Sequence, residues 1–200
     1  SKTLIRKAYM NIENIVRDQF ARRFRKVMEN TYLNGTGVNQ PLGVFTNSAN
    51  GISESRDIST GNTTTAMTGE GLIEAKFNLA AQYRNANCRW CFHRDGVKKI
   101  RKLKDGEGQY LWTQGLNGQP DNILDMPYHE SEYAPNTFTT GKYVGILGDW
   151  STYWIVDALN MTIQVLTELY AETNQNGYIA RFEGDGMPVL QEAWSRIKLA

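Results

Sequence analysis

The residue pair with the greatest potential for chemistry is Cys88 and Cys91, which form a C-x-x-C spacing. In redox proteins of the thioredoxin type, this spacing places a thiol of low pKa at the start of a helix. Here the residues from Cys88 to His93 are typical of a buried strand, in which side chains three positions apart point to opposite faces. Zinc would need two further ligands, and only His93 and His129 exist, at a spacing that fits no zinc module. We therefore expect structural cysteines and predict no metal site.

Other combinations of reactive side chains are incomplete. His129 with Asp149 would be the pair of a small hydrolase, provided that the two side chains converge in a concave pocket. Asp149, Asp157 and Glu172 are scattered, without paired spacing and without a nearby histidine to complete a triad. The sequence therefore predicts no catalytic residue and no enzyme, and the hydrolase is kept as an alternative hypothesis.

Two stretches could contact phosphate groups. Gly35-Thr36-Gly37 follows a predicted helix, where the dipole presents its negative pole, whereas phosphate-binding loops precede a helix. A plain turn is therefore favoured there, and we predict no cofactor site. The cations from Arg94 to Lys104 are the strongest local charge run, so a nucleic-acid-binding module is a second alternative. Because no aromatic residues are interleaved for stacking on bases, a solvated helix face is favoured.

Composition limits the class of protein. The 200 residues, 40% apolar and 22% charged, can bury one substantial core or two small ones. The net charge is +1, so the whole chain has no field that selects nucleic acid or an anionic membrane. No apolar run approaches the roughly 18 residues of a membrane span, and no secretion signal is recognisable, which predicts a cytoplasmic or intravirion setting. The chain begins at Ser1 without a methionine, which predicts a fragment of a longer protein.

A long helix is predicted near the start of the chain. Asn11 is suited to cap it, and Asn34 with Gly35 would end it in a left-handed stop, so the helix has roughly 22 residues. Apolar residues at three- and four-residue steps form one stripe: Ile12, Ile15, Val16, Phe20, Phe24, Val27 and Met28. The other face carries Arg17, Arg22, Arg23, Arg25 and Lys26. A solvated face is favoured for these cations, and a surface for an acidic neighbour is the alternative.

The middle of the chain is predicted to mix loops, helices and a strand. Residues 46–69 are dominated by Ser, Thr, Asn and Gly, which predicts a long mobile surface loop. A helix is expected over 71–84, with one side formed by Ile73, Phe77, Ala80 and Ala81. A buried strand follows over 88–93, and Asp95 would cap a short basic helix that continues to Lys104.

The second half is richer in strand. Short strands are predicted over 110–112, 123–129 and 143–147. Residues 153–158 are apolar, and residues 162–170 alternate with Ile163, Val165 and Leu166 inward, which predicts strands. Residues 178–182 would form the returning strand of a long antiparallel hairpin. A strand or short helix over 189–199 closes the chain. Helices and strands do not alternate regularly, so the predicted class is α+β.

Motifs along nearly the whole chain resemble one family of shell proteins. The L-N-G-x-G turn at Leu33–Gly37 is followed by the Q-P-x-G-hydrophobic stretch Gln40–Val44. The further matching segments are Ser1 with Leu4, Leu103–Asp105, Gly108–Trp112, Gly148–Trp150 with Tyr153, Ile155–Asp157, Arg181, Gly184–Gly186 and Ala193. In this order they resemble the major capsid proteins of tailed bacteriophages of the Hong Kong 97 type.

This resemblance implies two subdomains with interleaved sequence. A peripheral subdomain would comprise residues 1–45 and 157–181, which are the spine helix and the long β-hairpin. An axial subdomain, with a mixed sheet and flanking helices, would comprise residues 46–156 and 182–200. The implied function is that of a structural subunit of an icosahedral bacteriophage or prophage capsid, whose axial subdomains meet in closing rings of five and six copies. The implied location is the virion, after assembly in the host bacterial cytoplasm.

The resemblance also implies the partners. These are other copies of the chain, with a scaffold or a maturation protease as further candidates and packaged DNA as a non-specific contact. The family's N-terminal arm and extended loop, which precede the spine helix, have no counterpart here. Some members crosslink a lysine on that loop to an asparagine, promoted by a glutamate near the end of the final hairpin. Because the loop is missing and Ala180 stands about where the glutamate would fall, no crosslink is predicted.

Overall fold

The computed structural model describes residues 12–104, 106–110 and 122–200, which form two compact units. The hairpin unit consists of residues 12–29 with Ile155–Asp185, and the sheet unit of Asn30–Trp154 with Gly186–Ala200. Contacts thus group residues 30–45 with the sheet unit, whereas the sequence prediction grouped them with the hairpin. The assignment of peripheral and axial roles stays a prediction.

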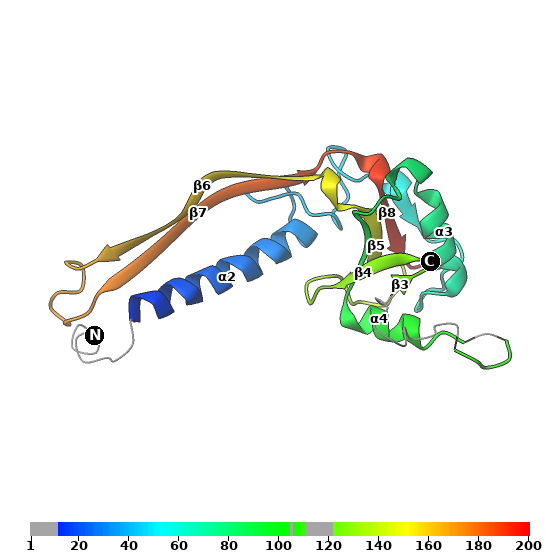
Figure 1. Cartoon of the computed structure of the whole chain (residues 1–200), viewed down its shortest axis with the longest axis horizontal. Coiled ribbons are helices and arrows are strands. Elements are labelled where there is room, and N and C mark those ends of the chain that lie inside the picture. The colour runs from blue at the N-terminus through cyan, green and yellow to red at the C-terminus, as the bar shows by residue number, and fades with distance from the viewer. Residues whose placement is uncertain (1–11, 105, 111–121) are drawn as a thin grey trace. The chain divides into compact units, whose positions relative to one another are not determined.

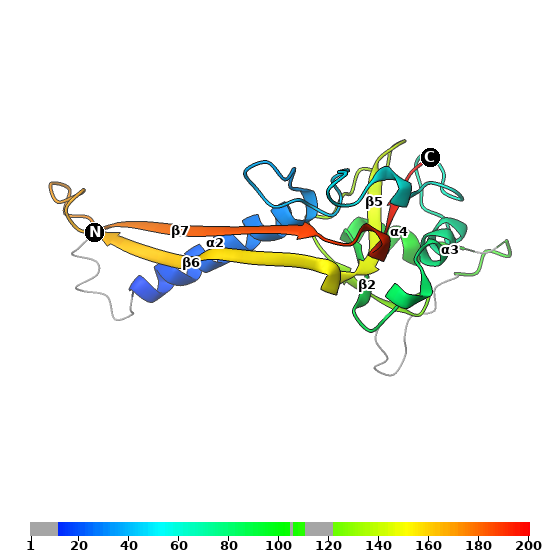
Figure 2. The ribbon, with the colours of Figure 1, turned by 90° about the horizontal axis from the view of Figure 1, so that it is seen from above.

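The hairpin unit combines one long helix with two long strands. Helix α2 (Ile12–Asn34) runs along one face of the ribbon formed by β6 (Tyr153–Leu166) and β7 (Gly177–Pro188) (Figures 1 and 2). The predicted helix and hairpin are confirmed, and the two predicted strands over 153–158 and 162–170 are one strand. Asn11, the proposed cap, lies outside the described residues.

The end of α2 differs in mechanism from the prediction. Gly35 does not adopt the left-handed conformation; Gly37 does, with φ 78°. Gly35 is required for another reason, because a Cβ there would collide with the carbonyl oxygen of Pro41. The turn folds the chain back against the helix end, where the Gly43 N–H donates to the Gly35 carbonyl at 2.8 Å. It is a tight turn, as predicted, and it follows the helix.

The sheet unit is built on a mixed six-stranded sheet of order β1-β8-β5-β2-β4-β3. At its centre, β2 (Cys88–Phe92) pairs antiparallel with β5 (Tyr143–Asp149) and parallel with β4 (Met126–Glu130). Strand β8 (Trp194–Lys198) pairs antiparallel with β5 and parallel with β1 (Asp57–Ile58). The predicted strand over 123–129 is two strands: β3 (Asn122–Ile123) turns into β4 through Leu124 and Asp125, both with positive φ. The α+β class is confirmed.

Both faces of this sheet are covered, which explains why β2 is an almost continuous buried run. Helices α3 (Gly69–Asn78) and α4 (Arg94–Arg101) cover one face, where Leu72, Leu79, Val97 and Ile100 pack on Trp90 and Phe92. The other face packs under residues from the segment after α2, among them Val44, Phe45 and Ile52, with Ile146 and Trp194. Short 3-10 turns complete the unit at Glu54–Arg56, Ala81–Tyr83, Trp150–Thr152 and Gln191–Ala193.

Three predictions in the middle of the chain were wrong in detail. Residues 46–69 are not simply a surface loop, because they contain β1 and bury Ile52 and Met67. Helix α3 ends at Asn78, and the apolar side named in the prediction faces outward: Ile73 and Phe77 are 45% and 66% exposed. Apolar residues occupy two faces of this helix, and helical spacing alone does not tell which one meets the sheet.

The short basic helix also differs from its prediction. His93, not Asp95, is the N-cap of α4, since its Nδ1 accepts the Asp95 backbone N–H at 3.1 Å. The helix ends at Arg101 instead of Lys104. Of the strand predicted over 110–112, Tyr110 forms an isolated antiparallel bridge with Lys104, and the rest lies outside the described residues.

Candidate functional site

The two cysteines lie on opposite faces of the central strand, as predicted. Cys88 packs in the core beneath α3 and α4, and Cys91 packs in the core on the other face. Cys88 and Cys91 are both buried and are not joined in a disulfide, and burial raises the pKa of Cys88 to about 11. A thiol of raised pKa is a poor nucleophile, so Cys88 is a core side chain. No cluster of three or more metal-ligating side chains occurs within residues 12–104, 106–110 and 122–200.

The sheet keeps His129 and Asp149 apart. In the strand register, Asp149 is opposite Cys88 and His129 is opposite Cys91, on the two strands that flank β2. Side chains of directly paired residues share a face, so these two point to opposite faces. His129 instead lies 3.1 Å from an Arg89 guanidinium nitrogen. The pair therefore cannot share a proton.

Asp149 has a structural role at the end of β5. Its carboxylate accepts hydrogen bonds from the hydroxyl and the backbone N–H of Ser151, at 2.6 and 3.0 Å. It accepts another from the side-chain amide of Asn85. Burial by itself would raise the pKa of Asp149, but these hydrogen bonds outweigh it and hold the pKa below its usual value. The carboxylate thus caps the turn Trp150–Thr152. The other acids considered, Asp157 and Glu172, are exposed in the hairpin unit.

The basic run over 94–104 is largely occupied by its own neighbours. An open depression on α4 is lined by Arg94, Val97, Lys98, Arg101, Lys102 and Glu130, so a carboxylate stands among the cations. Three of the cations in the run have partners from other segments: Lys99 lies on the Phe138 ring, Arg101 donates to the Tyr128 hydroxyl and Arg94 pairs with Glu132. Sequence reasoning missed the aromatic partners because they are distant in the chain.

The hairpin unit carries apolar side chains that it does not cover. On α2 the half-buried positions are Ile12, Val16, Phe20, Phe24 and Met28, four residues apart, while Ile15 and Val27 of the predicted stripe are exposed. Phe24 contacts Phe182 of β7, with ring centroids 6.1 Å apart. Of the side chains that the structure places in residues 12–29 and 155–185, none is fully buried.

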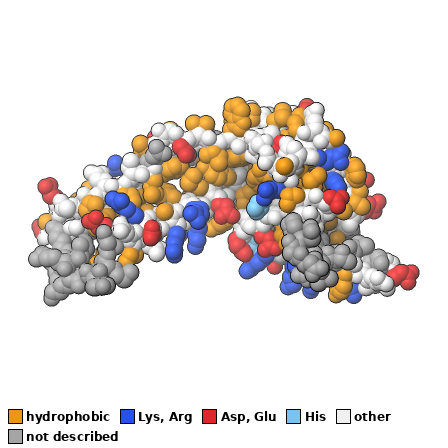
Figure 3. Space-filling model, in the orientation of Figure 1, with side chains coloured by type: hydrophobic (Ala, Val, Ile, Leu, Met, Phe, Trp, Pro, Cys, Tyr) orange, Lys and Arg blue, Asp and Glu red, His pale blue; other side chains and the backbone are white. Residues whose placement is uncertain are grey.

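Strand β6 shows this exposure most clearly. Four of its apolar residues, Ile155, Leu159, Met161 and Val165, are 51, 36, 39 and 40% exposed. Hydrophobic side chains accordingly reach the surface along the hairpin unit in Figure 3. An exposed apolar stretch of this kind is typical of a surface that another protein chain covers. We regard this surface, Ile155, Leu159, Met161 and Val165, as the candidate assembly surface.

A buried ionic cluster holds the segment after α2 on the sheet. Arg196 on β8 is fully buried, and its guanidinium lies 2.7 Å from the Asp57 carboxylate on β1. It also donates to the carbonyl oxygens of Thr46 and Ser53, at 3.1 and 3.0 Å. The Tyr143 hydroxyl donates to the second oxygen of Asp57 at 2.9 Å. This cluster anchors residues 46–58, the first part of the loop predicted over 46–69.

Tyr143 makes the stability of this cluster depend on pH. Burial and the hydrogen bond to Asp57 raise the pKa of Tyr143 to about 12, although Arg196 acts in the opposite direction. An unfolded tyrosine ionises at about pH 10. The contribution of the neutral Tyr143 side chain to the free energy of unfolding is therefore complete below about pH 10 and is lost as the pH rises to about 12. We expect the difference in unfolding free energy between the natural protein and Tyr143→Phe, from urea titrations, to shrink in that window. A difference that stays constant with pH would contradict this assignment.

Comparison with solved structures defines the class of fold. The capsid of an empty GTA particle is 21% identical, with a TM-score of 0.84 over all of this chain and 70% of that chain. A chain of Gordonia phage Cozz is 14% identical, with a TM-score of 0.65 over all of this chain and 66% of that one. The holo-SrpI encapsulin complex of Synechococcus elongatus PCC 7942 is 13% identical, with a TM-score of 0.67 over 98% of this chain and 69% of that chain. The fold is that of the Hong Kong 97-type shell proteins.

Family comparison completes the identification. The phage capsid family matches residues 1–199, and this chain belongs to that family. The chain is therefore a structural capsid protein of bacteriophage type, as the ordered motifs predicted.

A partial sequence match to an enzyme does not assign an activity to this chain. The alanine–tRNA ligase of Flavobacterium psychrophilum is 29% identical over 105 residues, which are half of this chain and a tenth of that protein. This match covers too little of either protein to assign a function. No helix in the described ranges has the length and apolar composition needed to cross a membrane.

Proposed function

We propose that this chain is a shell subunit that associates with copies of itself into pentamers and hexamers enclosing a genome. The observation that supports this most directly is the candidate assembly surface. Covering apolar side chains that are a third to a half exposed contributes on the order of 1 kcal/mol each. Association with a second copy is a direct way to gain this energy. The shell would be the virion capsid, assembled in the host bacterial cytoplasm.

The proposed roles of the subdomains follow the family. The peripheral subdomain, residues 1–45 and 157–181, would join neighbouring subunits, and the axial subdomain, residues 46–156 and 182–200, would meet its copies around the ring axes. Rings need heterologous interfaces that close, so the two sides of each contact are different surfaces of the same chain. A scaffold or a maturation protease would be an additional partner of the full-length protein.

We propose no catalytic role. The hydrolase alternative required convergence of His129 and Asp149, and their opposite faces on the sheet argue against it. The nucleic-acid-binding alternative at residues 94–104 is weakened because several of those cations already have partners.

The test is assembly of the full-length protein, followed by sedimentation velocity and electron microscopy. We expect rings or shells from the natural sequence, and loss of assembly in Leu159→Lys with Met161→Lys, which charges one side of β6. Gln164→Lys is the matched control, because it adds a lysine at an exposed polar position of the same strand. Thermal unfolding of each variant separates a loss of association from a loss of folding.

Two results would count against this proposal in different ways. A full-length protein that stays monomeric at high concentration, with its assembly partners present, would overturn the function. Normal shells from the Leu159 and Met161 variant would leave the function standing but remove the candidate assembly surface from it.

A further inference from the structure

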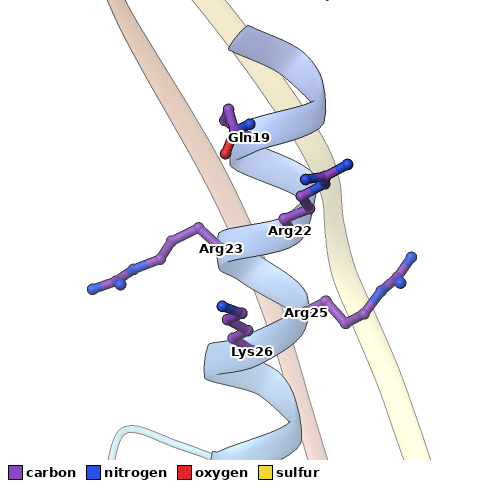
Figure 4. A pocket seen from close by; sticks show the side chains of 5 residues that line it. All are labelled: Gln19, Arg22, Arg23, Arg25 and Lys26. Carbon is purple, nitrogen blue, oxygen red and sulfur yellow. The ribbon is translucent and has the colours of Figure 1, made fainter. Parts of the chain in front are cut away.

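Helix α2 presents four cations in five consecutive positions, Arg22, Arg23, Arg25 and Lys26. All four are exposed, and together with Gln19 they line an open depression on the helix (Figure 4). In the part of the chain that the structure describes, none of the four has a carboxylate within ion-pair distance. We call this set the α2 basic cluster.

The α2 basic cluster places like charges next to one another on the helix. Residues three and four apart are neighbours on a helix, so Arg22 faces both Arg25 and Lys26, and Arg23 faces Lys26. Like charges at these spacings destabilise a helix by about 0.2–0.5 kcal/mol per pair. A bound polyanion would remove this repulsion. The cations of α4 differ, since Arg94, Lys99 and Arg101 already have partners and Glu130 stands among them.

We propose that the α2 basic cluster binds the phosphate backbone of double-stranded nucleic acid. This inference rests on the proposed function, because a shell that encloses a genome holds such a polyanion in contact with its wall. Arginine binds phosphate through two parallel N–H groups, and three of the four cations are arginines. Arg23 and Arg25 extend from opposite sides of the helix in Figure 4. This spread suits several phosphates along a strand better than one small anion.

An acidic surface on a second copy fits the α2 basic cluster less well. No window of five residues in the whole sequence holds more than two Asp or Glu, so this chain offers no acidic segment of matching charge density. The acids occur as pairs such as Glu183 with Asp185, or Glu168 with Glu172. A self-contact would have to draw its acids from separate segments of the chain.

The salt dependence of DNA binding tests this proposal on capsomers of the full-length protein. Each phosphate contact contributes about −0.9 to the slope of log K against log salt, so four contacts weaken binding about 150-fold between about 50 and 200 mM salt. The probe is a short, fluorescently labelled duplex DNA. Arg22→Gln with Lys26→Gln should reduce the magnitude of the slope by about 1.8.

Two control variants separate the cluster from general charge effects. Lys98→Gln with Lys102→Gln removes two exposed cations, also four residues apart, from α4, and should leave the slope unchanged. Replacing Arg22, Arg23 and Arg25 by lysine keeps the charge, and should keep the slope while weakening affinity severalfold. Circular dichroism reports whether α2 remains helical in each variant.

The outcomes divide clearly. An unchanged slope in the Arg22 and Lys26 variant, or an equal loss in the α4 control, overturns the proposal. A lost slope in the lysine variant also overturns it, because the charge is retained. Loss of shell assembly with an unchanged DNA slope would assign the cluster to a protein contact instead. If the full-length protein forms shells and the Arg22 and Lys26 variant lowers the slope as expected, both proposals stand. If the slope falls as expected but the full-length protein forms no shells, only the proposed function is overturned.

Discussion

Replacing Arg196 by methionine should lower the free energy of unfolding by about 3–5 kcal/mol, because it leaves the Asp57 carboxylate buried without its cation. The Arg196 side chain is fully buried and that of Asp57 is only 7% exposed, so water cannot replace the lost interaction. The carbonyl oxygens of Thr46 and Ser53 would lose their donors as well. Urea denaturation of the protein, followed by tryptophan fluorescence, measures this loss.

The matched control for Arg196 is Lys198→Met on the same strand. Lys198 also approaches Asp57, but at 3.7 Å and with 31% of its side chain exposed. Its removal should cost less than about 1 kcal/mol, as for other partly exposed ion pairs. The double variant Arg196→Met with Asp57→Leu should recover part of the stability, since no unpaired charge remains buried. Equal effects of the Arg196 and Lys198 variants would show that the cluster does not anchor residues 46–58.

Trp194→Ala should also cost about 3–5 kcal/mol, through lost burial and the cavity left behind. Trp194 is fully buried in the core on the Cys91 face and packs edge-on against Trp150, with ring centroids 5.1 Å apart. The same substitution at Trp154, which is 62% exposed, is the control and should change stability little. Thermal and urea unfolding give both values.

Gly148 allows a sharper version of this prediction. A Cβ at Gly148 would overlap the Trp194 ring, so Gly148→Ala should cost about 1–3 kcal/mol by overpacking. In the Trp194→Ala background the ring is absent, and the added methyl group would lie in the cavity. The cost of Gly148→Ala should then nearly vanish, which a double-mutant cycle detects. Additive effects would mean that the ring and the glycine are not packed as described.

The sheet unit and the hairpin unit differ in how completely their apolar side chains are buried. The sheet unit has a core on each face of its sheet, whereas the hairpin unit has half-buried stripes on α2 and β7 and no fully buried side chain among those described. Substitutions in the sheet unit should therefore act on folding, and substitutions on β6 should act on association. This division makes assembly variants interpretable, because their monomers should remain folded.

Some of the candidate site was readable from sequence and some was not. The cations of α2 are adjacent in sequence, so the α2 basic cluster was visible, although the prediction favoured a solvated face. The long hairpin was predicted because alternation and the turn at 174–177 are local signals. The exposed apolar side of β6 was not predicted, because alternation shows that a strand has an apolar face and not what covers it.

Features that depend on local order could be predicted from the residues alone. These are the helix that ends at the Asn34 turn, the hairpin, the buried strand with its two cysteines on opposite faces, and the ordered motifs of the capsid family. Features that depend on contacts between distant residues became visible only in the folded chain. It paired Arg196 with Asp57, 139 positions away in the chain. It also chose Leu72 over Ile73 as the inner side of α3 and separated His129 from Asp149. Periodicity is a property of neighbours in sequence, whereas burial and pairing depend on which surfaces the folded chain brings together.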